Sequence, residues 1–252
     1  MTGTLYVIGV GPGDPELMTL KAVRILKTVK CICFPKGREE GSSMALDIVK
    51  KVISVHNKEL IEAYFPMRKT KASAPGSSER RKSFWGGAHA FELDTKWNET
   101  VKTVLSILNR GDDMAFITIG DPTIYSTFFY LYDRLLELNP LLSIEIVPGI
   151  SSITASAAQA GISLGLADER IAILPATYAN DIGMVIEHFD TVILMKVHKV
   201  FDQVLGMLDA TGLTGKAIYI SRTGMEDGQV VRDIGTLRGK ELNYFSILII
   251  RK

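Results

Sequence analysis

The stretch VIGVGPGDPE, Val7–Glu16, decides the fold of this chain. An apolar run from Leu5 to Val10 is typical of a buried strand, and it leads into three glycines at alternate positions before a helical pattern begins. A strand, a glycine-rich turn and a helix in this order resemble the phosphate-binding turn of nucleotide-binding α/β domains. The composition of the turn itself argues against a phosphate ligand.

The glycines are Gly9, Gly11 and Gly13, which is not the G-x-G-x-x-G spacing of dinucleotide-binding turns. Pro12 has no amide hydrogen to donate. Asp14 places a carboxylate at the start of the following helix, where it caps the helix and repels an anion. The turn therefore suits close approach by a ligand that is not a phosphate. The alternative is a tight turn that needs glycine only for its backbone geometry.

Composition narrows the class of protein. The chain has 252 residues, long enough for one large α/β domain or two smaller ones, and its 29 basic and 28 acidic side chains give no sign of a nucleic-acid partner. It has no cationic start followed by a long apolar core, and no apolar run approaches the roughly 20 residues of a membrane span. Cys31 and Cys33, one residue apart on a predicted strand, are expected to be buried thiols. We therefore expect a cytoplasmic protein with no membrane partner.

The order of the predicted elements indicates an α/β protein with two domains, residues 1–147 and 148–252. Strands and helices alternate in the first half, and the strands near the C-terminus have little helix between them and are expected to be antiparallel. One helix is predicted from Pro15 to Thr28, with Asp14 as its N-cap, and another from Ile124 to Leu138. Between the predicted elements, Met67–Ala90 is a long loop with no apolar period and many basic residues.

Two further strand ends carry small-residue turns. They are TIGDPTIYST, Thr118–Thr127, and VPGISSITASAAQAGISL, Val147–Leu164. Ligands of α/β sheets gather at the carboxyl ends of the strands, so the three turns point to one site.

These motifs resemble those of the tetrapyrrole methylases that use S-adenosylmethionine. The family's G-x-G-P-G-D and L-x-T-L-K-A motifs correspond to Gly9–Ala22, its G-D-P turn to Gly120–Pro122, and its V-P-G-[IV]-[ST]-[SA] turn to Val147–Ser152. Within the family, PKGREEGSSMALDIV (Pro35–Val49) and KVHKVFDQVL (Lys196–Leu205) are similar to the enzymes that methylate carbon 20 of the macrocycle in cobalamin biosynthesis. The Met67–Ala90 loop is the stretch that departs from the family.

The resemblance implies the two-domain fold of the class III methyltransferases, with S-adenosyl-L-methionine bound in a cleft between the domains and S-adenosylhomocysteine released as product. It also implies a homodimer, and precorrin-2 or cobalt-factor II as the tetrapyrrole substrate. The residues expected at the cofactor are Pro12, Ile119, Gly120, Asp121, Ile124, Ser151, Ser152, Met195, Ala217 and Gly224. For several of them a structural role is the alternative: Asp121 and the two serines could cap helices, and Met195 could fill the core.

The substrate carries carboxylates, so lysine and arginine are expected around it. Candidates are Lys36, Arg38, Lys196 and His198, together with Lys199 and the basic loop from Arg68 to Lys82, although a solvated surface would explain any one of them. Tyr125 is the candidate catalytic residue, because its hydroxyl could orient the macrocycle or assist the departure of a proton from carbon 20. Its alternative is a packing role in the predicted helix. No metal site is expected, because the four histidines have no ligand spacing.

Other activities stay open at this point. The chain could methylate another position of the tetrapyrrole, or a protein side chain as in diphthamide synthesis. It could also be a nucleotide-cofactor oxidoreductase, which Pro12, Asp14 and the glycine spacing disfavour, or a tetrapyrrole carrier without catalysis. A binding test with the nicotinamide cofactor would decide on the oxidoreductase, and tight binding of S-adenosylmethionine would separate a methylase from a carrier.

Overall fold

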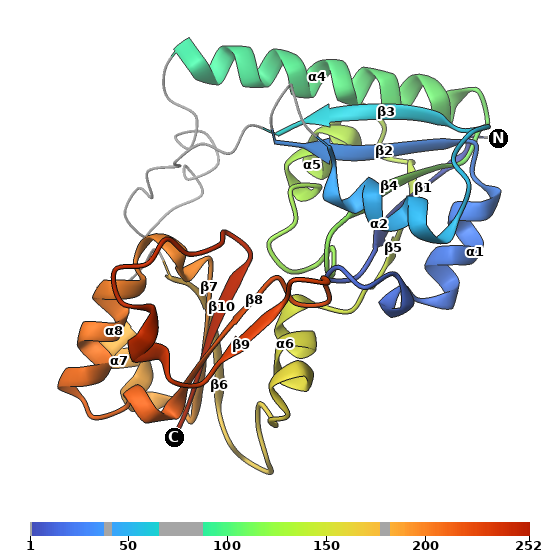
Figure 1. Cartoon of the computed structure of the whole chain (residues 1–252). Helices are drawn as coiled ribbons and strands as arrows, with labels where there is room; N and C mark the ends of the chain where they lie inside the picture. The colour runs from blue at the N-terminus through green and yellow to red at the C-terminus, as the bar shows by residue number, and fades with distance from the viewer. Residues whose placement is uncertain (1, 38–41, 66–87, 177–181) are drawn as a thin grey trace. The chain divides into compact units, whose positions relative to one another are not determined.

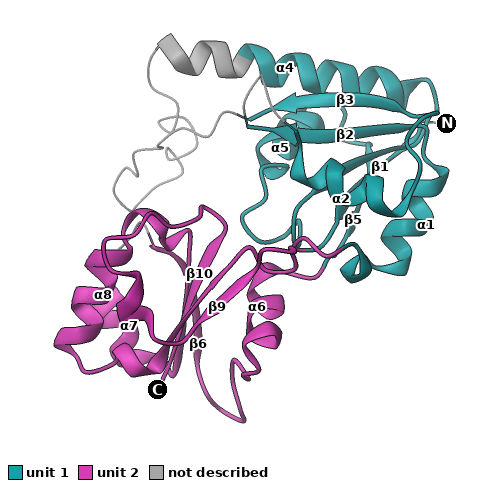
Figure 2. Cartoon of the chain, in the orientation of Figure 1, with its two compact units in different colours: residues 1–11, 15–149 teal, residues 12–14, 150–252 magenta. Residues whose placement is uncertain are grey.

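The computed structural model describes residues 2–37, 42–65, 88–176 and 182–252, with the side chains of residues 88–94 left out. The chain forms two compact units, one of residues 1–11 and 15–149 and the other of residues 12–14 and 150–252 (Figure 2). The short segment Pro12–Asp14 thus belongs to the second unit although its flanking residues belong to the first. A simple division at residues 147 and 148 does not anticipate this exchange.

The first unit is built on a five-stranded parallel sheet with the strand order β3-β2-β4-β1-β5 (Figure 1). Its strands are β1 (Thr4–Gly9), β2 (Cys31–Lys36), β3 (Glu59–Tyr64), β4 (Met114–Thr118) and β5 (Ser143–Val147). Its helices are α1 (Leu20–Thr28), α2 (Met44–Val52), α4 (Ala88–Asn109) and α5 (Phe129–Leu138).

Alternate residues of these strands point to opposite faces of the sheet, and each face is covered by a pair of helices. Val7 and Phe116 pack on one face with side chains from α4 and α5, whereas Ile8 and Ile117 pack on the other with side chains from α1 and α2. Both faces are therefore buried, which explains why β1 and β4 read as continuous apolar runs. The carboxyl ends of the strands remain as the place for a ligand.

The second unit has a mixed sheet with the order β6-β7-β10-β8-β9, in which only β6 and β7 are parallel. Its strands are β6 (Ile171–Pro175), β7 (Thr191–Met195), β8 (Ala217–Ser221), β9 (Gln229–Val231) and β10 (Ser246–Arg251). Its helices are α6 (Ser152–Ala160), α7 (Ile182–His188) and α8 (Phe201–Ala210). Figure 1 shows α6 on the other side of this sheet from α7 and α8. The antiparallel pairing expected near the C-terminus is present.

Two predicted helix starts are wrong. Asp14 does not cap α1: residues Pro15–Leu17 form a short 3-10 turn, and Thr19 is the N-cap, its side-chain oxygen accepting the Ala22 amide at 3.1 Å. Helix α5 begins at Phe129 rather than Ile124, because the preceding residues form a turn after Asp121. Helix α4 begins at Ala88, inside the predicted loop, and the basic residues from Arg68 to Lys82 lie outside the described residues.

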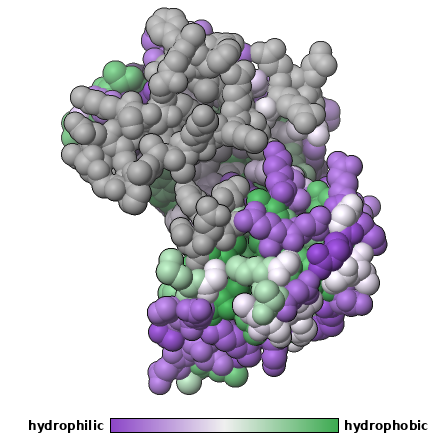
Figure 3. All heavy atoms as spheres, turned by 90° about the vertical axis from the view of Figure 1, so that its left-hand side faces the viewer, coloured by the Kyte–Doolittle hydropathy of each residue, from purple (hydrophilic) through white to green (hydrophobic). Residues whose placement is uncertain are grey.

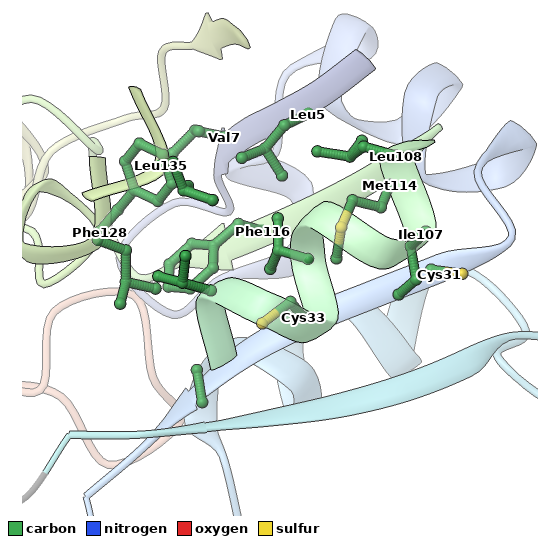
Figure 4. Close-up of a cluster of buried hydrophobic side chains, with 14 of the residues drawn as sticks. Leu5, Val7, Cys31, Cys33, Ile107, Leu108, Met114, Phe116, Phe128 and Leu135 are labelled. Carbon is green, nitrogen blue, oxygen red and sulfur yellow. The ribbon is translucent and has the colours of Figure 1, made fainter. Parts of the chain in front are cut away.

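Cys31 and Cys33 are free and buried, as predicted, and Figure 4 shows both in the cluster with Phe116 and Met114. Burial, together with the neighbouring Glu59 carboxylate, raises the pKa of Cys31 to about 11, and burial alone raises the pKa of Cys33 to about 12. Both thiols therefore stay protonated and unreactive near neutral pH.

No helix in the described part of the chain combines the length and the apolar character needed to cross a bilayer. On the face that Figure 3 presents, apolar areas lie among hydrophilic side chains of the described residues.

Candidate functional site

Three glycines at the carboxyl ends of β1, β4 and β5 bring the strand ends into backbone contact. A Cβ atom on Gly9 would lie 2.5 Å from the carbonyl oxygen of Gly120 and 2.8 Å from the amide nitrogen of Gly149. A Cβ atom on Gly149 would lie 2.3 Å from the same Gly120 oxygen. The Gly120 carbonyl thus sits between the Cα atoms of Gly9 and Gly149, where no side chain fits. We call Gly9, Gly120 and Gly149 the glycine junction.

Beyond the junction, the β1 and β4 chains continue to pair. The Val10 amide donates to the Thr118 carbonyl at 2.9 Å, and Gly120 donates to the Gly11 carbonyl at 2.8 Å in an isolated antiparallel bridge. Gly11 has a φ of +82°, a conformation that side chains rarely adopt. Gly9 therefore allows close backbone approach and Gly11 allows the turn, which agrees with the alternative that the glycines serve backbone geometry.

Asp121 connects the turn after β4 to the end of β5. Its Oδ1 accepts the Thr123 amide at 2.8 Å and also the Thr123 hydroxyl, and its Oδ2 accepts the Gly149 amide at 3.0 Å. The carboxylate is therefore engaged with protein donors on both oxygens. The predicted cofactor neighbours Ile119, Gly120 and Ile124 all lie within three residues of it, and Ile124 donates to the Asp121 carbonyl at 3.3 Å.

Tyr125 lies in this turn and not in α5, so its predicted alternative role as a helix packing residue does not apply. It has a φ of +54° and is half exposed. A bulky residue in the left-handed region is strained, at a cost on the order of 1–3 kcal/mol, and such residues cluster at functional sites. Its accessible ring is compatible with contact to a large planar substrate.

In the second unit, the segment Pro12–Asp14 packs on the turn after β8. A Cβ atom on Gly13 would lie 3.0 Å from the Thr223 carbonyl oxygen, and one on Gly224, whose φ is +74°, would lie 2.9 Å from the Asp14 amide nitrogen. Thr223 in turn makes a buried hydrogen bond to Ser156 of α6, with 2.7 Å between the two hydroxyl oxygens. Pro12 and Gly224, both expected at the cofactor, are thus parts of one packed arrangement.

Of the two serines after Pro148, Ser151 has the capping role that the sequence left open as an alternative to ligand contact. Ser151 is the N-cap of α6, and its hydroxyl oxygen accepts the Ile153 amide at 3.2 Å, while Ser152 is the first residue of that helix. Both side chains are partly exposed, so they remain accessible to a ligand.

Met195 and Ala217 lie at different ends of their sheet. Met195 is the last residue of β7 and pairs with Ile247 of β10. On its other side, Ile247 pairs with Ile220 of β8, so Ile220 lies level with Met195 across the sheet. Ala217 is the first residue of β8, three positions before Ile220, or about 10 Å along the strand. Ala217 is also buried, with 1% relative exposure. The structure therefore does not bring Ala217 to the end of the sheet where Met195 lies.

Of the predicted substrate cations, Lys36 is paired: its Nζ lies 3.1 Å from both carboxylate oxygens of Glu62 on the neighbouring strand β3. Arg38 lies outside the described residues. Lys196 has a φ of +59° and follows β7 directly. Partial burial lowers its pKa.

His198 lies two residues further on, with its ring 5.2 Å from the ring of Tyr244 in an edge-to-face arrangement. Burial lowers the pKa of His198, and the neighbouring charge of Lys199 lowers it further. The end of β7 is thus a partly desolvated region of positive charge, which suits carboxylates.

The residues present fit S-adenosylmethionine better than a nucleotide. Pro12 offers no amide hydrogen to a phosphate, and Asp14 in the same segment supplies a negative charge, which a sulfonium cation tolerates and a phosphate does not. No group of three or more histidine, cysteine, aspartate or glutamate side chains that could hold a metal occurs in the part of the chain that the structure describes.

Comparison with known proteins defines the class. Residues 4–238 match the family model of the tetrapyrrole (corrin/porphyrin) methylases. The chain belongs to this family, whose members use S-adenosylmethionine, so the fold class predicted from the sequence is confirmed.

Relatives of similar length carry more specific names. The cobalt-precorrin-2 C(20)-methyltransferase of Salmonella typhimurium is 30% identical over 100% of this chain and 98% of its own length. The precorrin-2 C(20)-methyltransferase of a Sinorhizobium species is 27% identical over 98% of this chain and 95% of its own.

Solved structures share the fold. Cobalt precorrin-4 methyltransferase superposes with a TM-score of 0.71 at 20% identity, covering 98% of this chain and 94% of the other. Uroporphyrin-III C-methyltransferase of Thermus thermophilus, solved in complex with S-adenosylhomocysteine, gives a TM-score of 0.64 at 17% identity, over 99% of this chain and 92% of the other.

Proposed function

We propose that this protein transfers the methyl group of S-adenosylmethionine to carbon 20 of precorrin-2, or of its cobalt-loaded form, in cobalamin biosynthesis. The observation that carries the proposal is the similarity to C(20)-methyltransferases over 100% and 98% of this chain. It agrees with the three ordered turn motifs, each of which contributes one glycine to the glycine junction.

When bound, S-adenosylmethionine supplies an electrophilic methyl group on sulfur, and the electron-rich carbon 20 needs no nucleophile from the protein. The chain's task is to hold the two reactants in line and exclude water, which can contribute on the order of 7–11 kcal/mol. Rigid backbone suits that task, and the glycine junction is rigid because its backbone atoms are in direct contact. The C–C bond at carbon 20 forms as the methyl–sulfur bond breaks, which leaves S-adenosylhomocysteine, and loss of the proton from carbon 20 completes the reaction.

For the cofactor site we propose residues of the junction turns, of the Pro12 segment and of its packing partner, and of the end of β7: Pro12, Ile119, Gly120, Ile124, Ser151, Ser152, Met195 and Gly224. Asp121 shapes the turn after β4. Ala217, which is buried at the far end of β8, can act on this site only through packing. For the substrate carboxylates we propose Lys196 and His198.

Tyr125 is proposed to orient the macrocycle, because its half-exposed ring stands on a strained turn beside the junction. Removing only the hydroxyl in Tyr125→Phe tests this role. We expect a lower kcat with S-adenosylmethionine affinity unchanged, whereas a wild-type kcat would leave the hydroxyl without a function in the reaction.

The protein is also proposed to be a cytoplasmic homodimer. The two free, buried cysteines agree with a reducing compartment, and the homodimer follows from the family resemblance alone. Light scattering coupled to size-exclusion chromatography measures the mass directly, and a monomer mass of 27.7 kDa would refute the dimer.

The decisive experiment offers labelled S-adenosylmethionine together with either precorrin-2 or the cobalt-loaded macrocycle, and maps the product by mass and NMR. Relatives are named for both forms of the substrate, so both are supplied. A single new methyl group on carbon 20 supports the proposal. Methylation elsewhere on the macrocycle would replace it with the alternative of a methylase for another position.

A further inference from the structure

We infer that Asp121 is a positioning residue: it shapes the S-adenosylmethionine site through the backbone of two turns and does not itself hold the cofactor. The inference rests on the proposed function, because it concerns the affinity for that cofactor. It differs from the expectation drawn from the family resemblance, in which Asp121 contacts the cofactor directly.

The hydrogen bonds of the carboxylate carry the inference. Oδ1 accepts both the amide and the hydroxyl of Thr123, and Oδ2 accepts the amide of Gly149 at 3.0 Å. Hydrogen bonds to an ionised carboxylate are stronger than neutral ones. One side chain therefore closes its own turn and joins that turn to the end of β5, which lies 28 residues away in sequence.

The Gly149 amide has a special position. Gly149 follows β5, and its Cα approaches the Gly120 carbonyl so closely that an added Cβ would lie 2.3 Å from that oxygen. The Gly120 residue is in turn bridged to Gly11. The hydrogen bond from the Gly149 amide to Asp121 thus holds the end of β5 against the ends of β1 and β4. Without this bond, Gly149 is free to move away from the Gly120 carbonyl.

The residues expected at the cofactor flank this carboxylate in sequence. Ile119 and Gly120 precede it, and Ile124 closes the turn by donating to the Asp121 carbonyl at 3.3 Å. A loosened turn would displace these backbone groups together. A displacement of backbone groups weakens every contact that the turn makes with a ligand, whereas the loss of one direct contact weakens only that contact.

Asp121→Asn is the primary variant. It keeps the size of the side chain, but its NH₂ group cannot accept a hydrogen bond, so either the Thr123 donors or the Gly149 amide lose their acceptor whichever way the amide is turned. We expect S-adenosylhomocysteine to bind about tenfold more weakly, the effect of losing one charge-assisted hydrogen bond. Isothermal titration calorimetry measures this affinity.

Asp113→Asn is the matched control. Asp113 also accepts a backbone amide with Oδ1, that of Thr4 at 2.7 Å, but it precedes β4 and so lies at the opposite end of the same sheet. We expect an unchanged affinity for S-adenosylhomocysteine, because the asparagine oxygen can still accept the Thr4 amide and the change lies at the far end of the sheet. If Asp113→Asn weakens binding as much as Asp121→Asn does, the effect is that of removing a carboxylate anywhere on the sheet, and the inference fails.

Thr123→Ala separates positioning from direct contact. If Asp121 acts through its turn, Thr123→Ala weakens the binding of S-adenosylhomocysteine. Thr123→Ala then weakens binding less in the Asp121→Asn background than in the wild type, because the hydrogen bonds between the two side chains are already weakened there. If Asp121 contacts the cofactor, Thr123→Ala leaves the affinity at the wild-type value, and that result overturns the inference.

Two failures are distinguishable in the same titrations. Wild-type protein that does not bind S-adenosylhomocysteine refutes the proposed function, and the inference with it. Wild-type protein that binds the ligand while Asp121→Asn binds it equally well refutes the inference alone. In NMR spectra of the unliganded protein, the Gly149 amide proton is expected to move upfield in Asp121→Asn whichever way the side-chain amide is turned, because a neutral oxygen is a weaker acceptor than a carboxylate oxygen and the NH₂ group accepts nothing. It is expected to stay in place in Asp113→Asn. An unmoved Gly149 amide in Asp121→Asn also overturns the inference.

Discussion

A single methyl group at the glycine junction tests the structural account of the opening motif. In Gly149→Ala the new Cβ would lie 2.3 Å from the Gly120 oxygen and 2.7 Å from the Gly9 oxygen, although contacts under 3.0 Å are essentially never found for a real Cβ. The backbone must therefore give way by at least 3.0 − 2.3 = 0.7 Å. Both neighbours are backbone atoms, so no side-chain rotation can relieve the overlap.

The expected cost is about 3 kcal/mol, the upper part of the range for overpacking a well-packed interior. For a protein of this size that corresponds to a fall in Tm of roughly 6–12 °C. Differential scanning calorimetry measures it, and titration with S-adenosylhomocysteine is expected to show weaker binding because the junction turns are displaced.

Gly206→Ala is the control, since it adds the same methyl group where nothing lies within 4 Å, on the exposed side of α8. Alanine is the better helix former, so we expect no loss and a gain of up to about 1 kcal/mol. If Gly149→Ala melts at the same temperature as wild type, the strand ends are not in backbone contact and the reasoning about the junction fails.

Three further perturbations have defined outcomes. Thr223→Val removes the partner of the Ser156 hydroxyl, which has 0% exposure, and should lower the free energy of unfolding in urea by about 1–3 kcal/mol, whereas adding Ser156→Ala should restore most of it. Cys31 and Cys33, with pKa values of about 11 and 12, should resist iodoacetamide at pH 8 in the folded protein and react after unfolding. The lowered pKa of His198 contributes stability above about pH 6.5, its unfolded value, and that contribution is lost as the pH falls through the folded pKa. His198→Gln should therefore lose less stability than wild type between pH 7.5 and 5.5.

Each of these has a contradicting result. An unchanged unfolding energy in Thr223→Val would mean that the buried hydroxyl pair does not form. Alkylation of the folded protein at the rate of the unfolded chain would mean that the two thiols are accessible. Parallel stability profiles of His198→Gln and wild type would mean that His198 titrates as it does in the unfolded chain.

The sequence predicted the elements with strong local patterns. The sequence pattern predicts strands over Ser143–Val147 and Ala217–Ser221 and a helix over Ser152–Ala160, and these are the bounds of β5, β8 and α6. Apolar runs bounded by turn residues, and for α6 a serine cap, specify both the type and the ends of these elements. It failed where competing caps were present: Asp14 and Thr19 both precede the α1 pattern, and only tertiary structure shows that Thr19 caps it. Helix α7 was missed because its seven residues are too few for a clear period.

The turns of the candidate site could be predicted from the sequence, but the hydrogen bonds within and between those turns could not. The three motifs indicated which strand ends come together, and their glycines indicated close backbone approach. That both oxygens of Asp121 are engaged within the protein depends on Thr123 and on Gly149, and a spacing of 28 residues gives no signal for such a bond. Nor could the sequence show that Glu62 pairs with Lys36, because the strand register that joins them is a property of the sheet.

The measurement that tests the central claim most directly is the methylation assay with purified protein, labelled S-adenosylmethionine and each form of the precorrin-2 macrocycle. The account predicts a product one methyl group heavier than the substrate, with the label on carbon 20. Binding of S-adenosylmethionine without methylation of either macrocycle at carbon 20 would contradict it.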